Sequence, residues 1–160
     1  VVVKQEGRLS EVDVDPDRVL DIDMLRWILL TGHDHLSLIR ANLTPDHFAS
    51  GVCRDLFTHF LDHLDRGEPL DVLTVAGDLD HAEHHIILTE IVKKRINTAR
   101  AAEGVRETLT KLLERHWMAR REEIRYKIQS GTCSDEEAIA LAREFDHLKK
   151  APPHLQEEPV

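Results

Sequence analysis

Eleven histidines are the residues of this chain whose type and spacing most suggest chemistry. His59 and His63 are four residues apart, as are His81 and His85, so each pair would share one face of a helix. Two such imidazoles can hold a metal ion together, but a site also needs further ligands and groups that orient them. The sequence has no HExxH motif, and the composition alone accounts for the acids near these histidines. We therefore interpret the histidines as surface residues.

Other patterns typical of metal-dependent enzymes are incomplete. His33-Asp34 is similar to the pair in HD-type phosphohydrolases, but no histidine precedes it and no second His-Asp pair exists. Glu144 and His147 form a single Glu-x-x-His, whereas a di-iron bundle uses two. The Asp-x-Asp pairs stand at expected linkers and helix starts, where aspartate is favoured as a cap. Because phosphate loops and nucleophile motifs are also missing from the sequence, we expect no catalytic residue, metal or cofactor in this chain.

The charge balance argues against a nucleic-acid partner. The 160 residues carry 21 Lys and Arg against 30 Asp and Glu, a net charge of -9, whereas nucleic-acid affinity depends on clustered cations. The best basic cluster, Arg120, Arg121, Arg125 and Lys127, is interleaved with glutamates. That interleaving is typical of a solvated helix face with ion pairs one turn apart. We expect no direct contact with nucleic acid.

Cysteine usage and hydropathy indicate a cytoplasmic protein. Cys53 and Cys133 each stand alone, and reduced thiols are the simpler interpretation of such a pair. No apolar run approaches the roughly 20 residues of a membrane span, and the N-terminus lacks the apolar core of a signal peptide. Because the sequence starts with Val, we expect a piece of a longer protein.

The elements that must position these residues are helices. Residues 1–19 are polar and acidic and are predicted to be a linker or tail. Asp21 or Asp23 can cap a first helix, whose apolar residues recur three and four positions apart, and a shorter helix is expected over residues 35–40.

The next segments have clear start and stop signals. Thr44-Pro45 predicts a helix start, with a hydroxyl cap followed by proline, and Gly67 predicts the end of that helix. Asp71 and Asp80 can open two more helices. Because no segment alternates with a period of two, the sequence predicts an all-α fold with a helical bundle over residues 20–102.

Residues 103–150 read as one long helix, a tight break and a returning helix. Gly131 stands where a left-handed helix end is expected, and Ser134 lies three residues before Glu137, as in a capping box. The apolar stripe of the long helix shifts around its axis near Trp117, so the first half should complete the bundle and the second half should pack on the returning helix. This hairpin subdomain is followed by residues 151–160, which we expect to be a flexible tail without core residues.

Two stretches of the bundle carry a resemblance to known modules. Residues 43–48, Leu-Thr-Pro-Asp-His-Phe, and residues 67–75, Gly-Glu-Pro-Leu-Asp-Val-Leu-Thr-Val, resemble two related families. One is the N-terminal domain of the replicative helicase DnaB, and the other is the helicase-binding C-terminal domain of the bacterial primase DnaG. The resemblance covers residues 20–150 and implies a DnaB N-terminal-like bundle.

The hairpin favours the primase module. The hairpin sequence resembles the helical hairpin that ends that module. It runs from Arg-Arg-Glu-Glu-Ile at 120–124 through Gly131 to Leu-Lys-Lys at 148–150. The resemblance implies a non-catalytic adaptor that docks on the N-terminal domain of DnaB, recruits primase to the replication fork and stimulates the helicase. The parent protein would be a DNA primase, and this piece would be a monomer in isolation.

A docking hairpin should expose apolar anchors within a charged rim. The residues that the hairpin itself should not bury provide three anchors, and their neighbours provide the rim. The predicted anchors are Met118, Tyr126 and Ile139, and the predicted rim is Arg121, Arg125 and Glu136.

Two alternatives stay open on the sequence. A helicase N-terminal domain or a helicase-loader module would self-associate through its hairpin. A metal-dependent phosphohydrolase of the HD type would bind stoichiometric metal.

Overall fold

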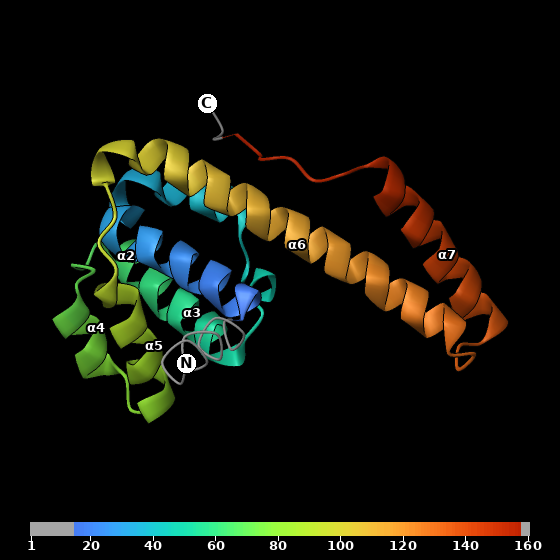
Figure 1. Ribbon diagram of the computed structural model, residues 1–160, viewed down its shortest axis with the longest axis horizontal. Helices are drawn as coiled ribbons and strands as arrows, with labels where there is room; N and C mark the ends of the chain where they lie inside the picture. Colours follow the sequence, from blue (N-terminus) through green and yellow to red (C-terminus); the bar gives the residue numbers. More distant parts are fainter. Residues whose placement is uncertain (1–14, 158–160) are drawn as a thin grey trace, which may run out of the picture.

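The computed structural model describes residues 15–157, and within that range every regular element is helical. The predicted all-α class, with a bundle followed by a hairpin, is confirmed (Figure 1). The elements in chain order are α2 (Pro16–Asn42), the 3₁₀-helix η1 (Pro45–His47), α3 (Gly51–Asp65), α4 (Val72–Asp78), α5 (Ala82–Lys93), the 3₁₀-helix η2 (Thr98–Arg100), α6 (Ala101–Gln129) and α7 (Asp135–Lys150).

The first helix begins earlier than predicted. Asp15 is the N-cap of α2, its side chain accepts a hydrogen bond from the backbone N–H of Asp17, and Pro16 takes the first helical position. The expected cap at Asp21 or Asp23 is therefore wrong, since both lie inside the helix. Residues 1–14 of the predicted linker lie outside the described residues.

Further boundaries follow from local chemistry. α2 bends at His35, where the backbone leaves helical angles, so the helix predicted over residues 35–40 is the last part of α2. Asp71 caps α4 as predicted, through the N–H of Thr74. The cap of α5 is His81 rather than Asp80, and its side chain makes no capping hydrogen bond.

The core lies among α2, α3, α5 and α6. Their apolar faces meet in one cluster of aliphatic and phenylalanine side chains, as expected of amphipathic helices packed in a bundle. The largest fully buried members are Phe48, Phe57, Phe60, Met24, Leu25, Ile28, Ile39, Leu56, Ile91, Leu109 and Leu112.

α6 belongs to both parts of the molecule. Its first half packs against α2 and completes the bundle, and its second half projects beyond the bundle, where α7 folds back beside it (Figure 1). The predicted change of packing partner along this helix is confirmed. Gly131, with φ of 70°, makes the turn between the two helices, and Ser134 caps α7 through the N–H of Glu137.

Within the described range, no helix is both long enough and apolar enough to span a bilayer.

Candidate docking surface on the α6–α7 hairpin

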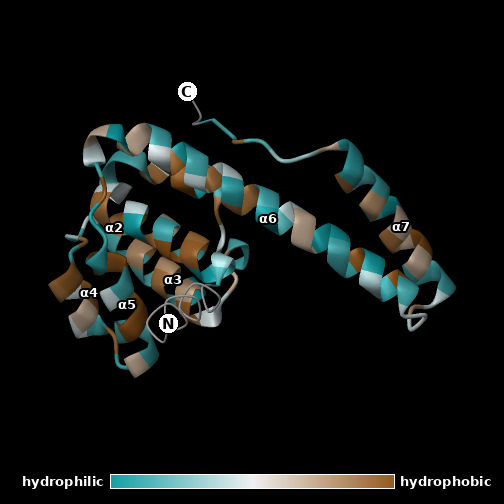
Figure 2. Ribbon diagram, viewed as in Figure 1, coloured by the Kyte–Doolittle hydropathy of each residue, from teal (hydrophilic) through white to brown (hydrophobic). Residues whose placement is uncertain are grey.

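The hairpin buries little apolar surface. Every residue of α7 is described, and none of them is buried; the side facing α6 is only half-buried. Across from it, Ile124 is the buried residue of the second half of α6. Figure 2 shows mostly hydrophilic residues along this part of α6, with the apolar ones widely spaced. The hairpin therefore depends on polar contacts more than the bundle does.

Two polar contacts join α6 to α7, one near the middle of α7 and one near its C-terminal end. The guanidinium of Arg120 donates to both carboxylate oxygens of Glu144, with Nε–Oε1 at 2.9 Å and Nη2–Oε2 at 2.7 Å. Trp117 Nε1 donates to the backbone oxygen of Leu148 at 2.8 Å. The bonds from Arg120 stabilise the ionised carboxylate and hold the pKa of Glu144 below its ordinary value. A forked, charge-assisted pair fixes the register of two helices as well as their separation.

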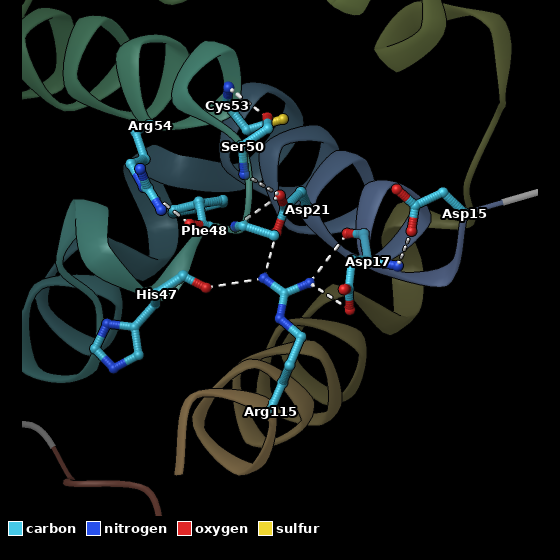
Figure 3. A network of polar contacts seen from close by, with 10 residues as sticks. Asp15, Asp17, Asp21, His47, Phe48, Ser50, Cys53, Arg54 and Arg115 are labelled. Carbon is cyan, nitrogen blue, oxygen red and sulfur yellow. Dashed lines mark hydrogen bonds and ion pairs between the residues drawn. The ribbon is translucent and has the colours of Figure 1, made fainter. Parts of the chain in front are cut away.

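Arg115 joins α6 to the bundle at the point where the two parts meet (Figure 3). Its Nη2 forms an ion pair with Asp21 Oδ1 and donates to the backbone oxygen of His47 at 2.8 Å. Its Nη1 donates to the backbone oxygen of Asp17 at 3.0 Å. Asp21 is fully buried, and its other oxygen, Oδ2, accepts from the backbone N–H groups of residues 49 and 50. The buried carboxylate is thus satisfied on both oxygens, as burial of a charge requires.

The same carboxylate explains where α3 begins. The sequence predicts its start at Thr44-Pro45, but those residues open only the short η1. Asp21 binds the N–H groups of residues 49 and 50, and this segment stays outside the helix. Ser50 then caps α3 by accepting from the N–H of Cys53. A long-range polar contact overrides a strong local start signal.

The three predicted anchors are all exposed, but they do not form one patch. Met118, Tyr126 and Ile139 expose 47%, 75% and 55% of their surface. At about 100° per residue, Tyr126 lies on the side of α6 opposite Ile124, and therefore faces away from α7. Ile139 lies on the outer side of α7, opposite the half-buried Leu141, and Met118 lies on a flank of α6. A single flat partner could not contact all three at once.

The predicted arginines lie together with Met118. Arg121 places its guanidinium 4.6 Å from the ring centre of Trp117, and Nη1 donates to Met118 Sδ at 3.6 Å. Arg121 and Arg125 also lie 5.5 Å and 5.7 Å from the ring centre of Phe145 on α7. Such cation–π contacts help to hold the hairpin closed and orient both guanidinium groups. Glu136, the third rim residue, is exposed in the first turn of α7.

A hollow of about 290 Å³ lies beside Arg125. It is lined by Arg125, Ile128 and Gln129 of α6 and by Ala142 and Phe145 of α7. On this flank, arginines of α6 come together with apolar side chains of both helices. We call it the arginine flank, defined by Met118, Arg121, Arg125 and Phe145.

Two of the histidines lie in different places from those expected, whereas His81 and His85 are exposed as expected. His63 and His84 are buried, so their interpretation as surface residues is wrong. His63 Nε2 lies 2.9 Å from Asp78 Oδ2, and His84 Nε2 lies 3.1 Å from Asp55 Oδ2, so a carboxylate provides a polar partner for Nε2 of each buried ring. Among residues 15–157, no three His, Cys, Asp or Glu side chains gather as metal ligands would.

Comparison with known proteins agrees with this architecture. The family model described as "DnaB-like helicase N terminal domain" matches residues 24–117, more than half of the chain. The chain belongs to this family. The match ends at Trp117, where α6 leaves the bundle, so the family model covers the bundle and the hairpin lies largely beyond it. No solved structure matches the chain significantly.

The curated relatives cover the hairpin as well. A DNA primase of Chlamydia trachomatis serovar D is 23% identical over 146 residues, covering 87% of this chain and 23% of the relative. A DNA primase of Chlamydia muridarum is 22% identical over 149 residues, covering 89% of this chain and 24% of the relative. The chain thus spans about a quarter of the length of the relatives it matches. The resemblance to primase and helicase modules that the sequence indicated is confirmed.

Sequence reasoning missed the Arg115–Asp21 pair, although a signal was present. Asp21 stands four and seven residues before Leu25 and Ile28, in line with the buried face of the first helix. Arg115 stands three residues after Leu112 on the buried side of the long helix. Opposite charges on the apolar faces of two helices are a sign of a buried pair between them.

Proposed function

We propose that this chain is the helicase-interaction domain of a bacterial primase. Its hairpin docks on the N-terminal domain of the replicative helicase DnaB, and through that contact it recruits primase to the replication fork and stimulates the helicase. The chain acts by binding, without a catalytic residue, metal or cofactor of its own, and is a monomer in isolation. The parent protein supplies primer synthesis.

One observation carries this proposal: a hairpin with exposed apolar residues extends beyond a bundle of the helicase N-terminal family, in a chain whose relatives are primases. A helical hairpin that buries no residue of its second helix has surface left for a partner. The arginine flank adds oriented cations beside an apolar hollow, a combination that suits an acidic and apolar partner surface.

Calorimetry with the N-terminal domain of the matching helicase tests the proposal. Because the predicted anchors lie on different sides, Met118→Ala, Tyr126→Ala and Ile139→Ala are made separately. We expect at least one of them to weaken binding about tenfold, roughly 1.4 kcal/mol, as truncation of an interface anchor does. The matched control is Leu73→Ala on α4, an apolar residue with 86% of its surface exposed but far from the hairpin along the bundle.

The results separate the possibilities. Absence of binding by the unmodified chain would contradict the function, and equal affinities for all three variants and the control would contradict the assignment of the anchors. Helicase ATPase activity with and without the chain tests stimulation.

The family match itself favours a second candidate, the N-terminal domain of a helicase. Such a module would self-associate through its hairpin. Light scattering of the isolated chain distinguishes the two, since a primase docking domain stays monomeric and a helicase module forms oligomers.

A further inference from the structure

The segment after α7 does not leave the molecule. Residues 151–157, which we call the C-terminal strap, run from the end of α7 back toward the bundle (Figure 1). The sequence predicts a flexible tail without core residues here, yet Leu155 packs against the core cluster of the bundle. A periodic pattern of apolar residues could not predict this contact, because the segment has no helical repeat and only one leucine makes the contact.

A side chain of the bundle forms two hydrogen bonds to the strap, which we call the clasp. Asn42, at the end of α2, is buried, and its Oδ1 accepts from the backbone N–H of Gln156 at 2.7 Å. Its Nδ2 donates to the backbone oxygen of the same residue at 3.0 Å and also to the oxygen of Leu38 at 2.8 Å. The amide therefore pairs with one backbone unit in both directions, as a neighbouring strand would. Beyond the clasp, Glu157 forms an ion pair with Arg106 of α6.

The path between α7 and the clasp is short and stiff. Pro152 and Pro153 follow the C-cap of α7, Ala151, and consecutive prolines favour an extended backbone with fixed φ angles. Only Ala151 to Leu155 separate the last turn of α7 from the clasped Gln156. A stiff connection of this length transmits the position of the clasp to the end of the helix.

Such a second attachment matters because α7 has little else to hold it. It buries no residue among its described positions and relies on Arg120 and Trp117 of α6 for its polar contacts. Helices with few buried contacts open locally at low free-energy cost. The strap connects the C-terminal end of α7 to α2, so α7 is held at both of its ends.

We propose that the C-terminal strap locks α7 against α6 and thereby pre-organises the arginine flank for docking. The strap contacts Asn42 at the end of α2 and Arg106 in the first half of α6, away from the residues of the flank. A partner that binds a locked hairpin does not have to supply the ordering entropy of α7, which favours affinity. The docking part of this inference rests on the proposed function, whereas the lock itself does not.

Two substitutions at one position test the lock. Gln156 contributes only its backbone to the clasp, so Gln156→Ala leaves both hydrogen bonds in place. Gln156→Pro removes the N–H that Asn42 accepts. By hydrogen exchange on the full chain, we expect the amides of α7 to exchange at least fivefold faster in Gln156→Pro than in Gln156→Ala. Amides of α3 should exchange equally in both, and equal rates in α7 would overturn the lock.

A chain ending at His154 gives an independent reading, because it removes Leu155 and the clasp without touching Asn42. We expect the same acceleration in α7 and about fivefold weaker binding to the helicase N-terminal domain. Faster exchange with unchanged affinity would overturn the pre-organising role. If the unmodified chain does not bind the helicase, the proposed function fails, while the exchange experiment still decides whether the lock exists.

Discussion

The two halves of α6 are parts of one continuous helix held by different forces. In the first half, Val105, Leu109 and Leu112 are completely buried against the bundle. In the second half, Ile124 alone reaches that state among the described residues, and contacts of Arg120, Arg121 and Trp117 also hold α7. Apolar burial gives cooperative stability in proportion to area, whereas partly exposed ion pairs add little free energy but define geometry.

This difference teaches where the molecule is stable and where it can interact. The bundle has an extensive apolar core, and it also exposes single apolar side chains such as Leu30, Leu73 and Ile86. The hairpin leaves Met118, Tyr126 and Ile139 exposed, and directional polar contacts help to hold its shape. A surface kept in shape but left uncovered is what a docking module requires.

The largest effect is expected where the halves join. Arg115→Met leaves the carboxylate of Asp21 buried without its cation, so we expect the free energy of unfolding to fall by about 3 kcal/mol. Chemical denaturation followed by circular dichroism measures it. Arg143→Met, at an exposed position of α7, is the matched control and should change stability by less than about 0.5 kcal/mol. Equal midpoints for the two variants would show that the bundle does not depend on this pair.

An intermediate effect is expected from the close approach of α6 to α2. A Cβ added at Gly104 would overlap the ring of Trp27, so we expect Gly104→Ala to cost about 1–2 kcal/mol despite its better helix propensity. At Gly77 of α4, no described atom lies within 4 Å of an added Cβ, and Gly77→Ala should stabilise by up to about 1 kcal/mol. Thermal unfolding of both variants checks the opposite signs. A gain at both positions would mean that the contact between these helices adjusts freely.

The smallest effect belongs to the hairpin and depends on pH. Hydrogen bonds from Arg120 lower the pKa of Glu144, so this group contributes stability above the ordinary pKa of glutamate, near pH ~4.3. That contribution disappears as the pH falls through the lowered pKa. Because the pair is partly exposed, we expect Glu144→Gln to cost only about 0.5 kcal/mol at pH 7, and less as the pH falls below ~4.

Thermal melts of Glu144→Gln and the unmodified chain at several pH values measure that difference. Glu107→Gln, an exposed glutamate on the bundle half of α6, is the control. A difference that grows as the pH falls would contradict the assigned direction.

Local sequence was sufficient for the helices whose ends are set by local chemistry. Gly131 and Ser134 define the hairpin turn because a left-handed glycine and a serine cap act within a few residues of themselves. The shift of the apolar stripe along α6 predicted its two packing partners for the same reason: periodicity records which face each segment buries. The exposure of Met118, Tyr126 and Ile139 also agrees with their place off the packed faces, while their role in binding stays a prediction.

What the sequence by itself determined is therefore the fold class, the hairpin and the identity of the buried faces, since each depends on residues close along the chain. The tertiary structure decided whether an aspartate caps a helix or pairs with a cation. Asp15 and Asp21 look alike in the sequence, but packing places Arg115, 94 residues further along the chain, against Asp21. It also decided that Leu155 and Gln156 rejoin the bundle at Asn42, 114 residues from Gln156 in the chain. Contacts of this range leave no periodic pattern, since they depend on how whole helices pack rather than on which residues follow one another.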